Sequence, residues 1–144
     1  MRDLSLRLFE FAVRVLKFLP GIEKTPESMV IRFQLSKSAT SSGANYEESQ
    51  AGSSKADFNN KVRIALKEMR ESNYWLRILK SILNKKDIEL EKLIIESEEL
   101  KKILGKIASK TSNPTKPGFA HFLFLSLYFF LVTCLSSFLN QLFL

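Results

Sequence analysis

Apolar residues recur at helical spacing in four separate runs, and this feature constrains the fold of the chain most strongly. The runs cover about residues 2–19, 26–49, 54–83 and 84–109, and Pro, Gly, Ser and Asn cluster between them. None of the runs alternates apolar and polar residues as a half-buried strand would. Four amphipathic helices joined by short loops are typical of a bundle. The sequence therefore predicts an all-α, up-down-up-down antiparallel four-helix bundle, followed by a C-terminal apolar helix.

Residues that favour helix ends mark the boundaries of these runs. Thr25 is expected to cap the second helix, with Pro26 at its first position, where the missing N–H costs nothing. Ser54 is expected to cap the third helix and Asn84 the fourth. Trp75 is assigned to the core or to an interface. The other residues expected to face the core are Leu4, Leu8, Phe11, Val15, Phe18, Phe58, Val62, Ala65, Met69, Leu76, Leu79, Ile88, Leu93, Leu100, Leu104 and Ile107.

The charge distribution separates the end of the chain from the rest. All 22 Lys and Arg and all 15 Asp and Glu residues, and hence the net charge of +7, lie before residue 118. Residues 119–144 form an uncharged run that exceeds the roughly 20 residues a helix needs to cross a bilayer core. We therefore predict a bundle in residues 1–112, a Pro-containing linker in 113–118 and an apolar tail in 119–144.

Three interpretations of the tail stay open: a membrane anchor, an incidental read-through or shifted-frame extension, and an extra helix packed on the bundle. Lysines precede the tail and no basic residue follows it, so the positive-inside rule would place the bundle in the cytoplasm and the C-terminus outside. The N-terminal helix carries charges throughout and lacks the apolar region of a signal peptide. We expect a cytoplasmic bundle, tethered to the inner membrane if the tail is an anchor.

The sequence offers little for catalysis or metal binding. Cys134 and His121 are the only residues of their kinds, and both lie in the apolar tail. A disulfide framework or a zinc site would need several such residues. No phosphate-binding glycine loop and no nucleophile motif occurs. We therefore expect a protein that is not an enzyme and that uses no metal or cofactor.

The third helix carries the most informative surface. Five of its residues follow one another at spacings of four, three, four and three and so share one face: Arg63, Lys67, Arg70, Tyr74 and Arg77. Residues 51–84 have a net charge of +4, more than half of the total. Such a face can hold phosphates, and its aromatic ring can stack on an unpaired base. It is a candidate site for RNA or DNA, although a merely solvated face is an equal alternative.

The second helix is unusual because small residues dominate its middle, among them Ser36, Ala39, Gly43 and Ala44. They allow a neighbouring helix to approach closely, either inside the bundle or at a subunit interface. Near the end of this helix, Asn45, Glu47 and Glu48, together with Glu68 on the third helix, are candidates for a buried polar cluster that fixes helix or subunit register. Solvated carboxylates are the alternative.

Several segments together resemble a known family. The residues 35–49, followed by 54–58, 64–68 and the Tyr-Trp-Leu at 74–76, are similar to the four helix bundle proteins encoded in intervening sequences of bacterial large-subunit ribosomal RNA genes. Distant relatives include the accessory variability determinant of diversity-generating retroelements, a basic homopentamer that associates with nucleic acid. The resemblance implies a ring-like homo-oligomer, a pentamer, without catalytic residues. It does not account for residues 119–144.

These observations lead to two hypotheses about function. The first is a noncatalytic, homo-oligomeric four-helix bundle that binds nucleic acid electrostatically through the basic face of the third helix. The second is a membrane-tethered scaffold that binds an unidentified protein partner and uses the apolar tail as its anchor. Substitution of the helix-three cations and deletion of the tail distinguish between them.

Overall fold

A computed structural model describes residues 3–52, 54–83 and 86–111 of the 144-residue chain. The described helices, in chain order, are α1 (Leu4–Phe18), the 3₁₀ turn η1 (Leu19–Gly21), α2 (Pro26–Gln50), α3 (Lys55–Ile82) and α4 (Ile88–Thr111). The chain divides into two units, Met1–Ser112 and Asn113–Leu144, and all the described residues belong to the first. The predicted linker and apolar tail therefore lie outside the described residues.

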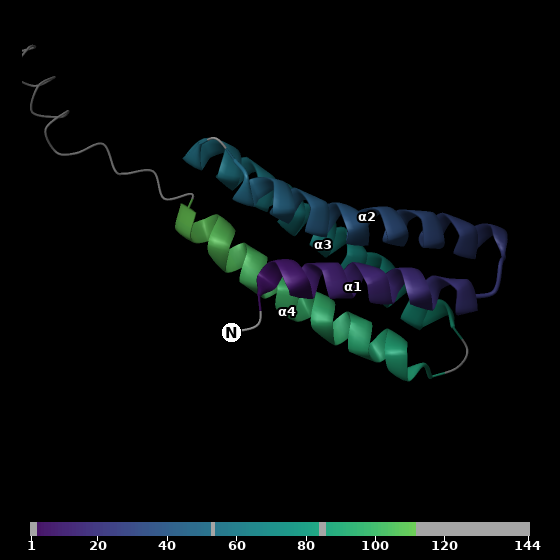
Figure 1. The fold of residues 1–144 in the computed structure, drawn as a ribbon. Coiled ribbons are helices and arrows are strands. Elements are labelled where there is room, and N and C mark those ends of the chain that lie inside the picture. Colours follow the sequence, from purple (N-terminus) through teal and green to yellow (C-terminus); the bar gives the residue numbers. More distant parts are fainter. Residues whose placement is uncertain (1–2, 53, 84–85, 112–144) are drawn as a thin grey trace, which may run out of the picture. The chain divides into compact units, whose positions relative to one another are not determined.

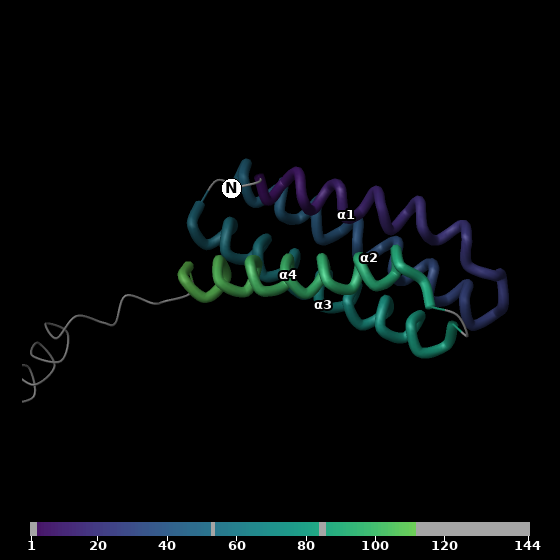
Figure 2. The backbone as a smooth tube through the Cα atoms, turned by 90° about the horizontal axis from the view of Figure 1, so that it is seen from below, coloured from purple at the N-terminus to yellow at the C-terminus, as the bar shows by residue number. Residues whose placement is uncertain are grey.

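The four α-helices run antiparallel to their neighbours in a bundle (Figure 1). α2 packs against α1 and α3, and α4 packs against the same two helices. α1 and α3 therefore occupy opposite corners, an arrangement that can be followed from below in Figure 2. The predicted all-α four-helix bundle is confirmed. Within the described ranges, none of the helices is both long and apolar enough to cross a membrane.

Polar side chains cap α2 and α3 at the predicted positions. Thr25 Oγ1 accepts a hydrogen bond from the Ser28 N–H at 3.2 Å, and Ser28 Oγ accepts one from the Thr25 N–H at 2.9 Å, so the two residues form a reciprocal capping box. Pro26 occupies the first turn of α2. Ser54 Oγ accepts from the Asp57 N–H at 3.1 Å. The predicted starts of the second and third helices are thus confirmed.

The fourth helix begins later than predicted. α4 starts at Ile88, and Asp87 Oδ1 accepts hydrogen bonds from the backbone N–H groups of Glu89 at 2.9 Å and Leu90 at 3.0 Å. The prediction that Asn84 caps this helix is therefore wrong, because the capping contacts belong to Asp87. Asn84 itself lies outside the described residues. Asp and Asn are similarly favoured at this position, so residue type alone does not choose between them.

The core consists mostly of residues that the helical periodicity predicts. Ile88 is the exception, because 73% of its surface is exposed and Leu90 and Leu93 turn inward instead. It is the first residue of α4, and the later start of the helix leaves it outside the packed part of the bundle. Leu4, Phe18, Phe58, Trp75 and Ile107 are partly buried against the core. The predicted residues that are fully buried are Leu8, Phe11, Val15, Val62, Ala65, Met69, Leu76, Leu79, Leu93, Leu100 and Leu104.

Buried hydroxyl groups join α2 to α3. Ser72 Oγ donates to Ser38 Oγ at 2.9 Å, and Ser42 Oγ donates to the Ala65 carbonyl at 2.9 Å. All four residues are fully buried. A buried hydroxyl without a partner would cost free energy, so these pairs favour one register of α2 against α3.

The small residues of α2 serve two different surfaces. Ala39 is fully buried, so it lets a neighbouring helix approach α2 closely, whereas a β-carbon at Gly43 would make only ordinary van der Waals contact with Leu8 of α1, at 3.8 Å. Ala44, in contrast, is exposed. The interpretation that the small residues pack inside the bundle is confirmed for Ala39 but does not extend to Ala44.

Substitution of Ala39 by Leu tests this packing. The larger side chain has no free volume at a fully buried position, so we expect the free energy of unfolding to fall by about 1–3 kcal/mol. Ala56→Leu is the matched control, because Ala56 is exposed on α3, and its effect should stay within about 0.5 kcal/mol. Chemical denaturation followed by circular dichroism measures both. Equal stability of the two variants would show that α2 does not need a small residue at position 39.

Ion pairs connect α1 to α4. Arg7 donates to Glu96 at 2.9 Å and to Glu99 at 2.8 Å, and Arg14 donates to Glu89 at 2.9 Å. Each of these contacts crosses the α1–α4 seam. The positive charges of Arg7 and Arg14 are therefore already compensated within the bundle.

Candidate nucleic-acid interface

The five residues predicted for nucleic-acid binding lie together on the outer face of α3. All five side chains are exposed, and Tyr74 is exposed to 54%. At 1.5 Å per residue, the row from Arg63 to Arg77 extends about 21 Å along the helix axis. Below, we call these residues the α3 basic face: Arg63, Lys67, Arg70, Tyr74 and Arg77. α3 packs against α2 and α4, and the exposure of these five side chains shows that neither helix covers this face within the described residues.

Three cations of the α3 basic face are not used by the bundle. The side chains of Lys67, Arg70 and Arg77 form no hydrogen bond or ion pair with any described residue. Other cations of α3 do form such pairs: Lys61 bonds Glu48 of α2, which raises the pKa of the lysine, and Lys80 bonds Glu91 of α4 at 2.8 Å.

The difference between paired and unpaired cations determines which residues of α3 can bind a ligand. A cation already bound to a carboxylate has less to gain from a phosphate, whereas an unpaired guanidinium can form charge-assisted, bidentate bonds with one. The unpaired cations are therefore those best placed to bind an anion.

Tyr74 is held by an aromatic contact. Its ring centroid lies 5.1 Å from that of Trp75, with the ring planes 70° apart, which is an edge-to-face arrangement. Trp75 is half-buried against the core, and its Nε1–H donates to Glu71 Oε1 at 3.3 Å. The tryptophan thus belongs mainly to the packing, as predicted, and it also orients the exposed tyrosine.

A polar seam between α3 and α4 sets the orientation of the α3 basic face. Asn73, only 2% exposed, donates from Nδ2 to Ser97 Oγ at 2.9 Å, and Lys101 Nζ donates to Asn73 Oδ1 at 3.4 Å. The same ammonium group donates to Glu98 Oε1 at 2.8 Å and lowers the pKa of that carboxyl group. Because Asn73 must face α4 to keep these bonds, the next residue, Tyr74, faces outward.

The residues proposed for a polar cluster have different surroundings in the structure. Glu47 and Glu48 are exposed, and Glu48 is paired with Lys61. Asn45 Nδ2 donates to the Ser41 carbonyl of its own helix at 2.9 Å. Glu68 is half-buried on α3. Within the described part of the chain, no hydrogen bond or ion pair joins the four residues Asn45, Glu47, Glu48 and Glu68 to one another. For Glu47 and Glu48, the alternative of a solvated carboxylate fits the structure.

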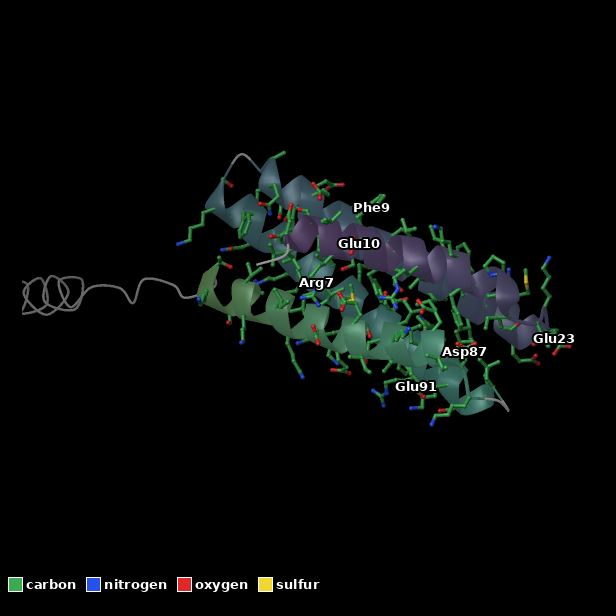
Figure 3. The ribbon with its side chains drawn as sticks, turned by 60° about the horizontal axis from the view of Figure 1, so that its bottom comes forward. Arg7, Phe9, Glu10, Glu23, Asp87 and Glu91 are labelled. Atoms are coloured by element: carbon green, nitrogen blue, oxygen red, sulfur yellow. The ribbon has the colours of Figure 1, made fainter. Side chains whose placement is uncertain are left out.

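An apolar groove between α1 and α2 is a second candidate surface, and the sequence analysis missed it. Its volume is about 590 Å³. Phe9 is 65% exposed and lies on the side of α1 away from Arg7, as Figure 3 shows. The groove is lined by Ser5, Leu6, Leu8, Phe9, Ala12, Val13, Leu16, Thr40, Gly43, Ala44 and Glu47. Six of the ten large apolar side chains exposed in the described residues lie on these two helices: Leu6, Phe9, Leu16, Met29, Val30 and Phe33.

A signal for this groove is present in the sequence. Leu6, Phe9, Val13 and Leu16 follow one another at spacings of three, four and three, which is a second apolar stripe on α1 beside the stripe that faces the core. A helix that buries only one face in a monomer needs only one such stripe. A second one indicates a further packing partner.

The described residues offer no site for a metal ion. Across residues 3–52, 54–83 and 86–111, no three His, Cys, Asp or Glu side chains come together closely enough to bind one. The polar groups that do gather are serine hydroxyls and ion pairs, which serve the seams between helices.

Comparisons with known proteins agree with this architecture. Residues 5–106 match the family model of the 23S rRNA-intervening sequence protein. A crystal structure of a protein with unknown function from the S23 ribosomal protein family of Bacteroides thetaiotaomicron is similar, with 34% sequence identity and a TM-score of 0.67. The match covers 74% of this chain and 98% of that one. No curated protein matched the sequence. The matched region contains most of the described bundle, and on this evidence the chain belongs to the 23S rRNA-intervening sequence protein family.

Proposed function

We propose that this protein is a noncatalytic, homo-oligomeric bundle that binds RNA or DNA through the α3 basic face. One observation carries the proposal: Lys67, Arg70 and Arg77 are exposed on one side of α3 and have no partner among the described residues. Cations spaced along a rigid helix can each neutralise a phosphate and release its counterions, which favours binding of a polyanion without regard to its sequence.

Ultraviolet crosslinking tests where nucleic acid binds. The full chain is irradiated with RNA and, separately, with DNA of mixed sequence, then digested, and the crosslinked peptides are identified by mass spectrometry. We expect the crosslinks to fall within α3 and to centre on Tyr74, which is the exposed aromatic residue of the α3 basic face. Crosslinks confined to α1 or α4 would contradict this assignment.

The proposal includes self-association, with a second copy of this chain in the α1–α2 groove. Most of the residues that line this groove are apolar, and exposed apolar surfaces of this kind often serve as interaction sites. Among the described residues, Glu47 is the only charged one that lines the groove. Each copy carries an excess of seven positive charges, so a cation of the neighbouring copy can pair with it. A ring of five copies is the assembly we propose. Repeating a +7 subunit would concentrate positive potential and strengthen binding of polyanions.

A second candidate role is a membrane-tethered scaffold for a protein partner. The sequence of residues 119–144 favours it, because this run is uncharged, is long enough to span a bilayer and follows five lysines between residues 101 and 116. Fractionation of cells that express the full chain, or a chain ending at Pro117, tests this role. Tethering predicts that only the full chain stays with the membranes after alkaline extraction, whereas recovery of the full chain in the soluble fraction would exclude it.

A further inference from the structure

We infer that the α3 basic face binds single-stranded nucleic acid in preference to duplex, by stacking one unpaired base on Tyr74. This inference rests on the proposed function and adds the class of ligand. It depends on three features of the structure: the exposure of Tyr74, its position among unpaired cations, and the contacts that hold its ring.

Tyr74 lies within the row of unpaired cations. Arg70 precedes it by one helical turn and Arg77 follows it by slightly less than one turn, so the two guanidinium groups flank the ring. Their Cα atoms are separated by about 10 Å along the helix axis. A strand whose base stacks on Tyr74 can therefore place the phosphates on either side of that nucleotide near Arg70 and Arg77.

The ring of Tyr74 is positioned before any ligand binds. The edge-to-face contact with Trp75, at 5.1 Å between centroids, restricts the orientation of the tyrosine. Trp75 is itself restricted by the core and by its hydrogen bond to Glu71. More than half of the tyrosine surface still faces solvent, at 54% exposure. A ring restricted in this way loses less conformational entropy on stacking than an unrestricted ring would.

The geometry favours single strands because a base must leave its neighbours to stack on a protein ring. In a duplex, the bases are stacked on one another and paired, and extruding one costs a few kcal/mol. In a single strand, the base faces are accessible and stacking on an aromatic side chain contributes about 1–3 kcal/mol per base. A duplex would thus use only the cations of the α3 basic face, whereas a single strand would use the cations and the ring.

Two substitutions of Tyr74 separate the ring from the charges. Tyr74→Leu removes the aromatic face and keeps every cation, and Tyr74→Phe keeps the face and removes the hydroxyl. The full chain and both variants are titrated, at one fixed salt concentration, against a single-stranded oligonucleotide and against the duplex of the same sequence and length. Because Tyr74 is exposed and outside the core, both variants should keep the thermal midpoint of the parent protein.

We expect Tyr74→Leu to weaken single-strand binding about 5- to 150-fold, the range that corresponds to the loss of one stacked base. Duplex binding should not change, and Tyr74→Phe should bind single strands as the parent protein does. Trp75 is the only tryptophan of the chain, so its fluorescence should respond to single strands and not to duplex.

The outcomes distinguish this inference from the proposed function. If Tyr74→Leu binds single strands as well as the parent protein does, or loses single-strand and duplex binding equally, stacking on Tyr74 is wrong and electrostatic binding through α3 still stands. If the parent protein binds neither ligand at low salt, the proposed function itself fails. If only Tyr74→Leu is impaired, and only toward single strands, both hold.

Discussion

The triple substitution Lys67→Glu, Arg70→Glu and Arg77→Glu is expected to abolish nucleic-acid binding and to leave the bundle folded. These three cations are exposed and have no partner among the described residues, so the fold does not depend on them. Their reversal places negative charges where phosphates would lie. We expect binding to disappear at salt concentrations where the parent protein binds, because each lost phosphate contact removes about one unit from the salt dependence. Fluorescence anisotropy with labelled RNA and DNA measures the effect.

A matched variant controls for the change in net charge. Lys92→Glu, Lys102→Glu and Lys106→Glu reverse three exposed lysines of α4, and the net charge then falls from +7 to about +1, as it does in the α3 variant. If binding depends on the position of the cations, the α4 variant should keep most of the parent affinity. Equal loss in the two variants would show that total charge, rather than the α3 basic face, determines binding.

The substitution Phe9→Glu is expected to dissociate the homo-oligomer into monomers of 16.5 kDa. Phe9 lines the α1–α2 groove and is 65% exposed in the isolated chain, so its side chain contributes little to the fold. In an assembly that fills the groove, the new carboxylate would be buried against apolar groups without a partner, which costs several kcal/mol per interface. Multi-angle light scattering measures the mass of the full chain and of a chain ending at Ser112, which keeps every described helix.

Ile95→Glu is the control for this substitution. Ile95 lies on α4, is 60% exposed and does not line the groove, so the same chemical change there should leave the mass of the assembly unaltered. A parent protein that is already monomeric would refute self-association. Dissociation by Ile95→Glu and not by Phe9→Glu would place the interface on α4 instead.

The fold could be predicted from the sequence because its main determinants are local. The spacing of apolar residues within each run defines the buried stripe, and Thr25 and Ser54 mark helix starts through contacts with residues three positions away. The start of α4 was misplaced because Asn84 and Asp87 are both good capping residues. A helix that starts at Asn84 would place Ile88 on its buried apolar stripe. Because α4 starts at Ile88 instead, this residue lies outside the core.

The α3 basic face was predictable in composition but not in its details. Spacing alone shows that Arg63, Lys67, Arg70, Tyr74 and Arg77 share one side of a helix. Which cations remain unpaired depends on the neighbouring helix. Lys80, for instance, lies close to the α3 basic face in sequence and is paired with Glu91 of α4. The contact between Tyr74 and Trp75 could not be predicted from the sequence either. Adjacent residues of a helix point about 100° apart, and these two side chains touch only because both rings are large.

The surroundings of the groove and of the proposed polar cluster could not be predicted from the spacing of residues along the sequence. Glu47 and Glu48 are neighbours in sequence, yet Glu47 lines the groove beside α1 and Glu48 pairs with Lys61 of α3. Adjacent helix positions diverge by about 100°, so closeness in sequence does not place two carboxylates in one site. The groove requires knowledge of which helix packs beside α1, and that is a property of the tertiary structure.

The most direct test of the central claim is the affinity of the full chain for mixed-sequence single-stranded RNA, measured by fluorescence anisotropy from low to moderate salt. If three or four cations of the α3 basic face each neutralise one phosphate, the logarithm of the binding constant should fall with the logarithm of the salt concentration, with a slope of about −2 to −3 for each bound copy. No binding at low salt, or an affinity that does not change with salt, would contradict electrostatic binding through α3.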